Sequence, residues 1–199
     1  MPKTVDPYID LETGILRNLV GAATYPELRK IEGDIVTLAE ISLTNIPHTA
    51  NLAELQRIHK SLFNKIYDWA GELRTINIRK GSKEYFLDYS YLETGAKFVF
   101  DNLQKEDFLQ NLDWESFTKR LAYFYEQLNF IHPFREGNGR TQRVFWQRVA
   151  NIAGYKIDWS KVIGDEIDHA SLIGRVENNL EPLEKMFDKI VKVNEQYNT

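Results

Sequence analysis

The chain has 199 residues and a mass of 23.3 kDa, which is enough for one domain with its own hydrophobic core. Hydrophobic residues make up 43% of it and charged residues 27%, which excludes an intrinsically disordered chain. The absence of cysteine excludes disulfide bonds, thiolate metal sites and a cysteine nucleophile, and a net charge of -4 argues against nucleic-acid binding through a basic patch.

No segment divides the chain or directs it to a membrane. Internal repeats, low-complexity tracts and Gly/Ser/Pro-rich linkers are absent from the sequence, so we expect a single domain over residues 1–199. No apolar run has the length needed to span a bilayer, and the N-terminal sequence MPKTVDPYIDLETG is too polar for a secretory signal. We therefore expect a soluble cytoplasmic protein.

Apolar residues recur with helical spacing through most of the chain, which predicts a mostly α-helical fold. In chain order, helices are expected at residues 27–43 and 52–71, then at 114–131 and 180–190. The longest pattern has apolar residues three or four positions apart and must face a core: Trp114, Phe117, Leu121, Phe124, Leu128 and Ile131. In the last helix, Pro182 is tolerated only in the first turn.

Residues 73–90, LRTINIRKGSKEYFLDYS, break the helical pattern. They alternate along the chain, pass through a Lys-Gly-Ser turn signal and continue in a β-prone run around Tyr85 and Phe86, which predicts a β-hairpin. Because an isolated hairpin is marginally stable in water, it must lean on the helical body. Its exposed edge can pair with an extended peptide, although a hairpin without a partner fits the sequence equally well.

The segment IHPFREGNGR, residues 131–140, follows the longest predicted helix. A residue before proline avoids the α conformation, so His132 is expected where that helix ends, with its side chain off the helix surface. Phe134 is the apolar residue within the turn, and we expect it to be the buried structural anchor of the loop. Apolar periodicity resumes after Gly139 and continues to Gly154, which predicts a second helix directly after the loop.

A glycine-rich loop at the start of a helix can bind an anion. The first N–H groups of the helix lack a partner within it, the helix dipole adds positive charge, and glycines let the backbone approach a ligand closely. Phosphate is the obvious occupant. Arg140 and Arg143 lie on one helix face and can bind further phosphates. Glu136 would repel those phosphates unless a cation bridged them, which indicates Mg²⁺ held mostly by water and phosphate.

His132 is then left without a binding role. An unperturbed imidazole titrates near neutrality and can take a proton from an attacking hydroxyl, so the loop predicts phosphoryl or nucleotidyl transfer. Each residue alone has a commoner explanation, such as a cap, a turn or a solvated face, and the prediction rests on their occurrence together. Other chemistries have no support, because the histidines lack paired metal-ligand spacing and no Walker-type loop is present.

The sequence HPFREGNGRTQR resembles the signature of the Fic (filamentation induced by cAMP) family, His-x-Phe-x-Asp/Glu-Gly-Asn-Gly-Arg-x-x-Arg, at every defined position. DPYIDLETGILRN, IHKSLFNKIYDWAGELRTINI and AGYKIDW are similar to other recurrent stretches of the family, so the resemblance covers nearly the whole chain. It implies an all-α helical bundle with a β-hairpin flap beside the active-site loop. It also implies a protein adenylyltransferase that uses ATP and Mg²⁺ to transfer AMP to a Tyr, Thr or Ser hydroxyl of a target protein.

The resemblance implies a role for each residue of the motif. His132 would be the base that deprotonates the target hydroxyl, and Glu136 would hold Mg²⁺ against the α- and β-phosphates. Arg140 would contact the distal phosphates and Arg143 the γ-phosphate, while the side chain of Asn138 would contact the α-phosphate. The anion hole would consist of Gly137, Asn138 and Gly139. The flap that docks the target would consist of Arg79, Lys80, Gly81, Ser82, Lys83, Glu84, Tyr85 and Phe86.

Family members are commonly silenced by a helix carrying Ser/Thr-x-x-x-Glu followed by Gly or Asn. No Ser or Thr of this chain has Glu four residues later, and the nearest candidates, Glu32 and Glu177, follow Leu28 and Ile173 instead. The resemblance then implies the subclass inhibited by a small antitoxin that supplies the Glu to Arg143. For this subclass it implies a toxin of a toxin–antitoxin pair, with gyrase or topoisomerase IV as targets.

Two alternatives remain for the activity. Fic relatives can transfer UMP, phosphocholine or the γ-phosphate, but phosphorylating relatives depart from Gly-Asn-Gly-Arg, and Glu136 with both arginines favours AMP. The second alternative is a regulatory module that binds nucleotide without turnover. The intact His132 argues against it, because binding alone does not require a base. Residues 174–180, GRVENNL, are the candidates for the nucleobase pocket.

Overall fold

The computed structural model describes residues 6–43, 46–79 and 85–195. This described part is mostly helical and contains one small sheet. The helices are α1 (Tyr25–Ile41), α2 (Leu52–Phe63), α3 (Leu92–Lys105), α4 (Trp114–Ile131), α5 (Asn138–Ile152), α6 (Gly164–Glu177) and α7 (Glu181–Ile190). The strands are β1 (Tyr155–Ile157) and β2 (Val191–Val193), and short 3₁₀ helices lie at Tyr89–Tyr91, Asp107–Leu109 and Trp159–Lys161.

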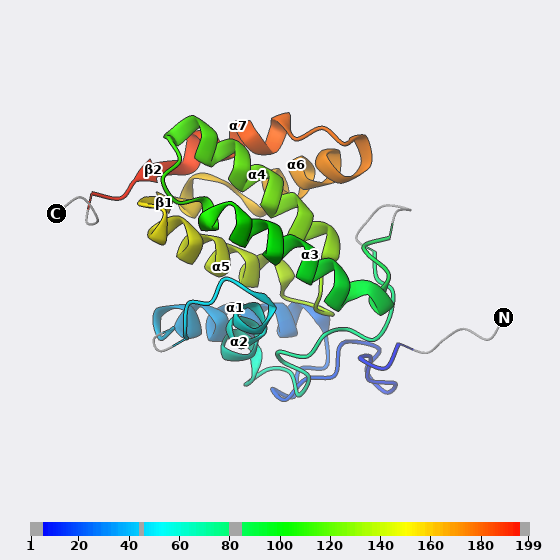
Figure 1. Ribbon diagram of the computed structural model, residues 1–199. Helices are drawn as coiled ribbons and strands as arrows, with labels where there is room; N and C mark the ends of the chain where they lie inside the picture. The colour runs from blue at the N-terminus through cyan, green and yellow to red at the C-terminus, as the bar shows by residue number, and fades with distance from the viewer. Residues whose placement is uncertain (1–5, 44–45, 80–84, 196–199) are drawn as a thin grey trace.

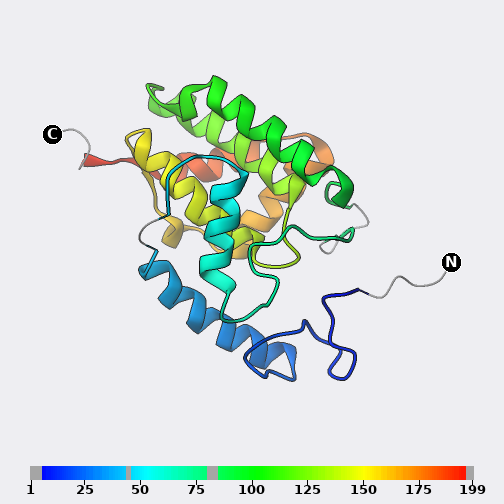
Figure 2. The ribbon, with the colours of Figure 1, turned by 60° about the horizontal axis from the view of Figure 1, so that its bottom comes forward.

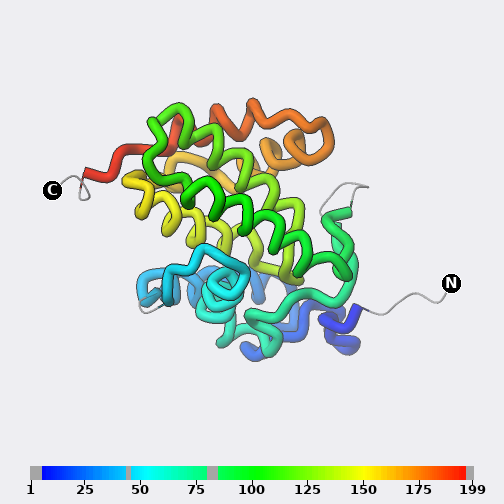
Figure 3. The backbone as a smooth tube through the Cα atoms, in the orientation of Figure 1, coloured from blue at the N-terminus to red at the C-terminus, as the bar shows by residue number. Residues whose placement is uncertain are grey.

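Helix α4 is central and packs against α3, α5, α6 and α7. Helix α5 also packs on α2, which in turn packs on α1. Figure 1 shows α6 and α7 above this central group and α1 and α2 below it, and Figure 2 shows α1 as the outermost of the lower pair. Strand β2 pairs antiparallel with β1, with Val191 opposite Ile157, so the end of α7 is tied to the segment after α5 (Figure 3).

The central position of α4 follows from its apolar stripe. Phe117, Leu121, Phe124, Leu128 and Ile131 are each at most 2% exposed, and the helix has the bounds that their spacing predicts. Asp113 caps its start by accepting a hydrogen bond from the Ser116 amide. None of the described helices combines the length and the apolar character needed to cross a membrane.

Helix α2 is shorter than its apolar pattern predicts, because it ends at Phe63 rather than near residue 71. Beyond it the chain turns back, and the amide of Gly71, at φ 87°, donates to Nδ1 of His59 at 2.8 Å. Ile66, Tyr67 and Trp69 are buried in these turns, which explains why their spacing resembles a helix. The pattern also failed to predict α3 and α6; α6 contains two glycines and buries few residues.

The predicted hairpin at residues 73–90 is described only in its two limbs. No strand is assigned in residues 73–79 or 85–88, but the amide of Phe86 donates to the carbonyl of Ile78 at 3.1 Å, as two paired limbs would. Lys80, Gly81, Ser82, Lys83 and Glu84 lie outside the described residues. The limbs therefore lie side by side where the sequence places a flap.

Glu54 joins three segments through a carboxylate with no exposed area. It accepts hydrogen bonds from Nε of Arg148 in α5 and from the amides of Thr49 and Ala50, each at 2.6 Å, and Nδ1 of His48 lies 3.0 Å away. Burial alone would raise the pKa of this carboxyl, but these partners lower it to about 2. Its contribution to stability is thus present above pH 4.5 and is lost as the pH falls toward 2.

We expect the substitution Glu54→Gln to lower the free energy of unfolding at pH 7 by ~3–5 kcal/mol, because it leaves the Arg148 guanidinium without its counter-charge. Urea unfolding measures this loss. Glu115→Gln, which removes an exposed ion pair with Lys119 on α4, is the matched control and should change stability little. The prediction is wrong if the Glu54 variant is as stable as the control, or if its deficit persists unchanged between pH 4.5 and 2.

Candidate active site

The loop between α4 and α5 is turned by two residues with left-handed backbone conformation. His132, at φ 47° and ψ 62°, ends α4, and Gly137, at φ 80°, precedes the first residue of α5. The first of these conformations is uncommon for a residue with a side chain, and Pro133 disfavours continuation of the helix through His132. His132 therefore ends α4 where the sequence predicts the end of the helix, and its imidazole stays beside the last turn, with Nδ1 3.1 Å from the carbonyl of Asn129.

Phe63 and Phe134 hold the loop from inside. Phe134 is fully buried and stacks on the ring of His59 at 3.9 Å, where the sequence predicts an apolar anchor. A Cβ at Gly137 would lie 2.4 Å from Cζ of Phe63, so both its φ and this contact require glycine. The Asn138 side chain closes the loop by accepting from the amide of Phe134 at 2.9 Å and donating to its carbonyl at 2.7 Å.

His59 and Arg74 satisfy the loop's buried carbonyl groups. Nε2–H of His59 donates to the carbonyl of Glu136 at 3.0 Å, while its Nδ1 accepts from the amide of Gly71. Burial lowers the pKa of His59 to about 4, so the ring is neutral and its tautomer is fixed by these two hydrogen bonds.

The Arg74 guanidinium is almost entirely buried and donates to backbone carbonyls of four residues: Ile76, Leu87, Ile131 and His132. Its own backbone amide donates to the carbonyl of Pro133 at 2.9 Å. Burial lowers the pKa of this arginine to about 10, which leaves it protonated at neutral pH. A single side chain thus ties the end of α4 to both limbs of the flap.

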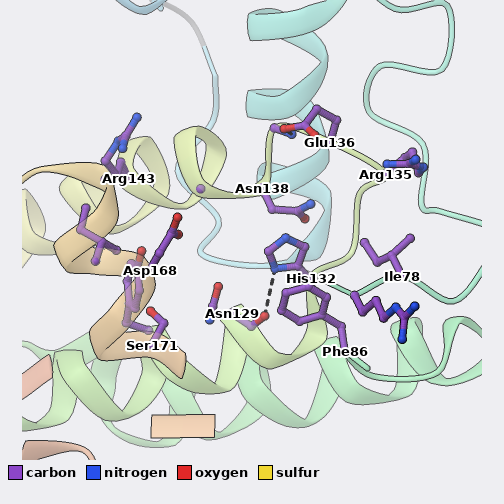
Figure 4. A pocket seen from close by; sticks show the side chains of 16 residues that line it. Ile78, Phe86, Asn129, His132, Arg135, Glu136, Asn138, Arg143, Asp168 and Ser171 are labelled. Carbon is purple, nitrogen blue, oxygen red and sulfur yellow. Dashed lines mark hydrogen bonds between the residues drawn. The ribbon is translucent and has the colours of Figure 1, made fainter. Parts of the chain in front are cut away.

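The loop faces a cavity of 220 Å³. One wall is the start of α5, a second is α6 with Ile167, Asp168 and Ser171, and a third is formed by Ile78 and Phe86 of the flap limbs (Figure 4). Most of the predicted site residues line it: His132, Glu136, Gly137, Asn138, Gly139 and Arg143. The side chain of Arg140 does not line this cavity and pairs instead with Glu32 of α1.

Contacts with Asn129 and Phe86 help to orient the His132 side chain. Its Nδ1 lies 3.1 Å from the carbonyl of Asn129 and donates to it, because a carbonyl oxygen can only accept. The ring of Phe86 stacks on the imidazole, with centroids 3.8 Å apart and planes 12° apart. Figure 4 shows the imidazole between Phe86 and Asn138, with the dashed hydrogen bond to Asn129.

Glu136 stands at the edge of the cavity with its side chain 46% exposed. The amide of Gly137 donates to its Oε1 at 3.0 Å, and Nη2 of Arg140 lies 3.9 Å from the same oxygen. No group of three or more His, Cys, Asp or Glu residues within the described ranges is placed to hold a metal ion. A cation at this position would therefore meet fewer than three such side chains from the described residues.

Three of the predicted flap residues are described. Arg79 and Phe86 line the cavity, and Tyr85 is 55% exposed with the Arg79 guanidinium 5.7 Å from its ring centre. The other five flap residues lie outside the described ranges.

Helix α6 supplies the wall that the sequence did not predict. Ser171 and Asp168 line the cavity, and Arg175 lies over the face of Phe86 at 4.5 Å, so α6 also supports the flap. Of the predicted nucleobase segment, only Arg175 lines the adjoining cavity of 180 Å³. Polar residues dominate α6, so its apolar periodicity is weak and gave no signal in the sequence.

Comparison with known proteins is consistent across sequence and structure. The model of the Fic/DOC family matches residues 49–150. The protein adenylyltransferase VbhT of Bartonella schoenbuchensis is 38% identical over 84% of this chain, which spans only 35% of that relative's length. An Escherichia coli protein named "probable protein adenylyltransferase Fic" is 31% identical over 94% of this chain and 92% of its own length.

Solved structures show the same arrangement of helices. BepC from Bartonella tribocorum, with bound AMPPNP, is 25% identical and aligns with a TM-score of 0.89 over 94% of this chain and 96% of the other. The N-terminal Fic domain of a VirB-translocated Bep effector from Bartonella quintana, with bound ADP, is 28% identical and also has a TM-score of 0.89, over 95% and 96% of the two chains.

We expect Arg74→Lys to destabilise the protein by at least ~2 kcal/mol, because one ammonium group cannot satisfy the carbonyls that the guanidinium reaches. Thermal and urea unfolding measure the loss. The control is Arg17→Lys, which alters an exposed pair with Asp68 and should leave stability near that of the wild type. Equal stability of the two variants would contradict the role assigned to Arg74.

The low pKa of His59 predicts how the stability of the protein depends on pH. Because its folded-state pKa is about 4 against an ordinary value of 6.5, the unfolded chain binds the proton first as the pH falls. Protonation of this group should therefore lower the free energy of unfolding of the wild type by on the order of 3 kcal/mol between pH 6.5 and 4. In His59→Gln this pH-dependent loss of unfolding free energy should be absent, although the variant should already be less stable at pH 6.5. Parallel stability curves for wild type and variant across this window would refute the assignment.

Proposed function

Because the chain belongs to the Fic/DOC family, we propose that it is a protein adenylyltransferase, which transfers AMP from ATP to a tyrosine, threonine or serine hydroxyl of a target protein. The observation that carries the proposal is one cavity where the start of α5, His132 and Arg143 meet. Similar proteins named adenylyltransferases, and similar structures with bound AMPPNP and ADP, support ATP as the co-substrate.

The phosphates of ATP lie at the start of α5. Backbone N–H groups there have no partner within the helix, and the helix dipole adds positive charge. A Cβ at Gly139 would meet no atom within 4 Å, which is consistent with space for a ligand beside this amide. Arg143, one turn into α5, binds the γ-phosphate through charge-assisted hydrogen bonds. The sequence also predicts that Arg140 contacts the distal phosphates, and for this contact its guanidinium would have to leave Glu32.

His132 is the general base of the transfer. Its Nε2 takes the proton of the target hydroxyl while the hydroxyl oxygen attacks the α-phosphorus. The bond between the α-phosphorus and the oxygen shared with the β-phosphate breaks, and pyrophosphate leaves. The α5 amides stabilise the negative charge on the α-phosphate oxygens as this bond changes.

Mg²⁺ fits the position of Glu136. The half-exposed carboxylate of Glu136 beside polyphosphate suits a cation that keeps most of its water and phosphate ligands. The Gly137 amide, which donates to Oε1 of Glu136, orients this carboxylate. When bound, Mg²⁺ would neutralise charge on the phosphates.

The target segment docks beside the flap, residues 79–86. Phe86 covers one face of the His132 ring, so the flap and the base are in direct contact. Exposed backbone on the flap limbs can register an extended target segment by strand pairing, which brings its hydroxyl to Nε2 of His132.

We also propose that a small antitoxin regulates the enzyme by supplying a Glu to Arg143. Arg143 lines the cavity described above and a second cavity of 310 Å³ beside Trp159, which none of the described flap residues line, so a partner can reach it without entering through the flap. Of the two internal candidates, Glu32 pairs with Arg140, and Glu177 is the last residue of α6. The enzyme would act in the cytoplasm as a toxin, and gyrase and topoisomerase IV are the candidate targets.

The proposal predicts that α-labelled ATP with Mg²⁺ transfers label to a protein in a cell lysate. His132→Ala should lower the transfer rate by ~10²–10⁴-fold, because a general base typically contributes that much. ATP affinity, measured on the same variant, should stay near that of the wild type, which separates loss of the base from loss of binding.

The remaining outcomes identify the alternatives. Label from γ-labelled ATP alone would indicate a kinase and would contradict AMP transfer. Nucleotide binding without any transfer would indicate a regulatory module. Transfer that persists in His132→Ala would remove His132 from the mechanism.

A further inference from the structure

Arg140 occupies an unusual position for a motif arginine. Its Nη2 forms an ion pair with Oε1 of Glu32, on α1, and its Cζ lies 4.8 Å from the ring centre of Phe63, on α2. Its side chain is 23% exposed and does not line the cavity at the start of α5. One side chain of α5 thus contacts α1 and α2, which lie more than seventy residues earlier in the chain.

Glu32 is buried and has a second partner. Its side chain is 8% exposed, and its Oε2 accepts a hydrogen bond from the hydroxyl of Tyr67. Burial, followed by the contact with Glu32, raises the pKa of Tyr67 above its ordinary value, so the hydroxyl stays protonated and donates. Each oxygen of this carboxylate therefore has its own donor, one of them cationic.

The contacts continue from Arg140 to the phosphate-binding loop. Phe63 carries the guanidinium on its ring, and the same ring fills the space in which a Cβ of Gly137 would lie. Nη2 of Arg140 is also 3.9 Å from Oε1 of Glu136, whose carboxylate accepts from the Gly137 amide. Displacing Arg140 would thus disturb the loop on both sides of Gly137.

We propose that Glu32 is a positioning residue that, with Tyr67, holds Arg140 as a brace for the phosphate-binding loop. Removing Arg140 from Glu32 would leave a buried carboxylate with a single neutral donor, which is strongly unfavourable. Arg140 therefore stays on Glu32 when nucleotide binds and acts on the loop rather than on the distal phosphates. The inference rests on nucleotide binding at this loop, as proposed above.

The two roles for Arg140 differ in which nucleotide they affect. AMP and ATP both place an α-phosphate at the start of α5, whereas only ATP has distal phosphates. A brace supports the binding of both nucleotides equally. A direct contact with the distal phosphates supports ATP alone.

The test is titration of AMP and ATP into the full chain by calorimetry or NMR, in EDTA so that no divalent cation contributes. Glu32→Gln and Arg140→Gln should each lower the affinities for AMP and for ATP by the same factor, roughly tenfold, which corresponds to ~1.4 kcal/mol of binding free energy. The double variant should bind both nucleotides as tightly as either single variant does, because both substitutions remove the same Glu32–Arg140 ion pair. Glu115→Gln, on the surface of α4, is the control and should bind both nucleotides as the wild type does.

Tyr67→Phe provides a second variant in case Glu32→Gln fails to fold, since it removes only one hydroxyl from the brace. It should lower the affinities for AMP and ATP equally, and by a smaller factor than the other variants do. Loss of ATP affinity with unchanged AMP affinity in Arg140→Gln, or unchanged affinities in Glu32→Gln and Tyr67→Phe, would overturn the inference. If the wild type itself binds neither nucleotide, the proposed function fails instead.

Discussion

A tight, buried loop between two helices needs a hydrogen-bond partner for each backbone group that it removes from water. Here His132 and Gly137 turn the chain in left-handed conformations, and the loop between them is packed under aromatic rings. Arg74, His59 and the side chain of Asn138 supply partners from three separate parts of the chain. The geometry of the site depends on these contacts, because together they fix both the end of α4 and the start of α5.

The functional consequence is preorganisation. An anion site made of helix N–H groups is effective only if the helix starts at a fixed place, and a base is effective only if its nitrogen faces the reacting atom. The same loop provides both, with Nδ1 of His132 held by Asn129 and the α5 amides only a few residues further along. The brace from Glu32 through Arg140 would add a third support, from α1, which lies outside α2 (Figure 2).

The sequence predicted those parts of the site whose signal is local. The stripe on α4, the loop after it and the buried anchor Phe134 follow from spacing, from proline and glycine, and from one apolar residue in a polar turn. The roles of Arg74 and Glu32 could not be predicted, since their partners lie far away in the chain. Helix α6 was missed because its buried face consists mostly of small residues, Ala170, Ser171 and Gly174 with Ile167, so its position is set by packing rather than by a pattern of large apolar residues.

The most direct test of the central claim is an experimental structure of the chain with Mg²⁺ and a non-hydrolysable ATP analogue. The account predicts the α-phosphate on the amides at the start of α5, with Nε2 of His132 facing the α-phosphorus and the guanidinium of Arg143 on the γ-phosphate. Phosphates bound elsewhere, or an imidazole turned away from the α-phosphorus, would contradict it.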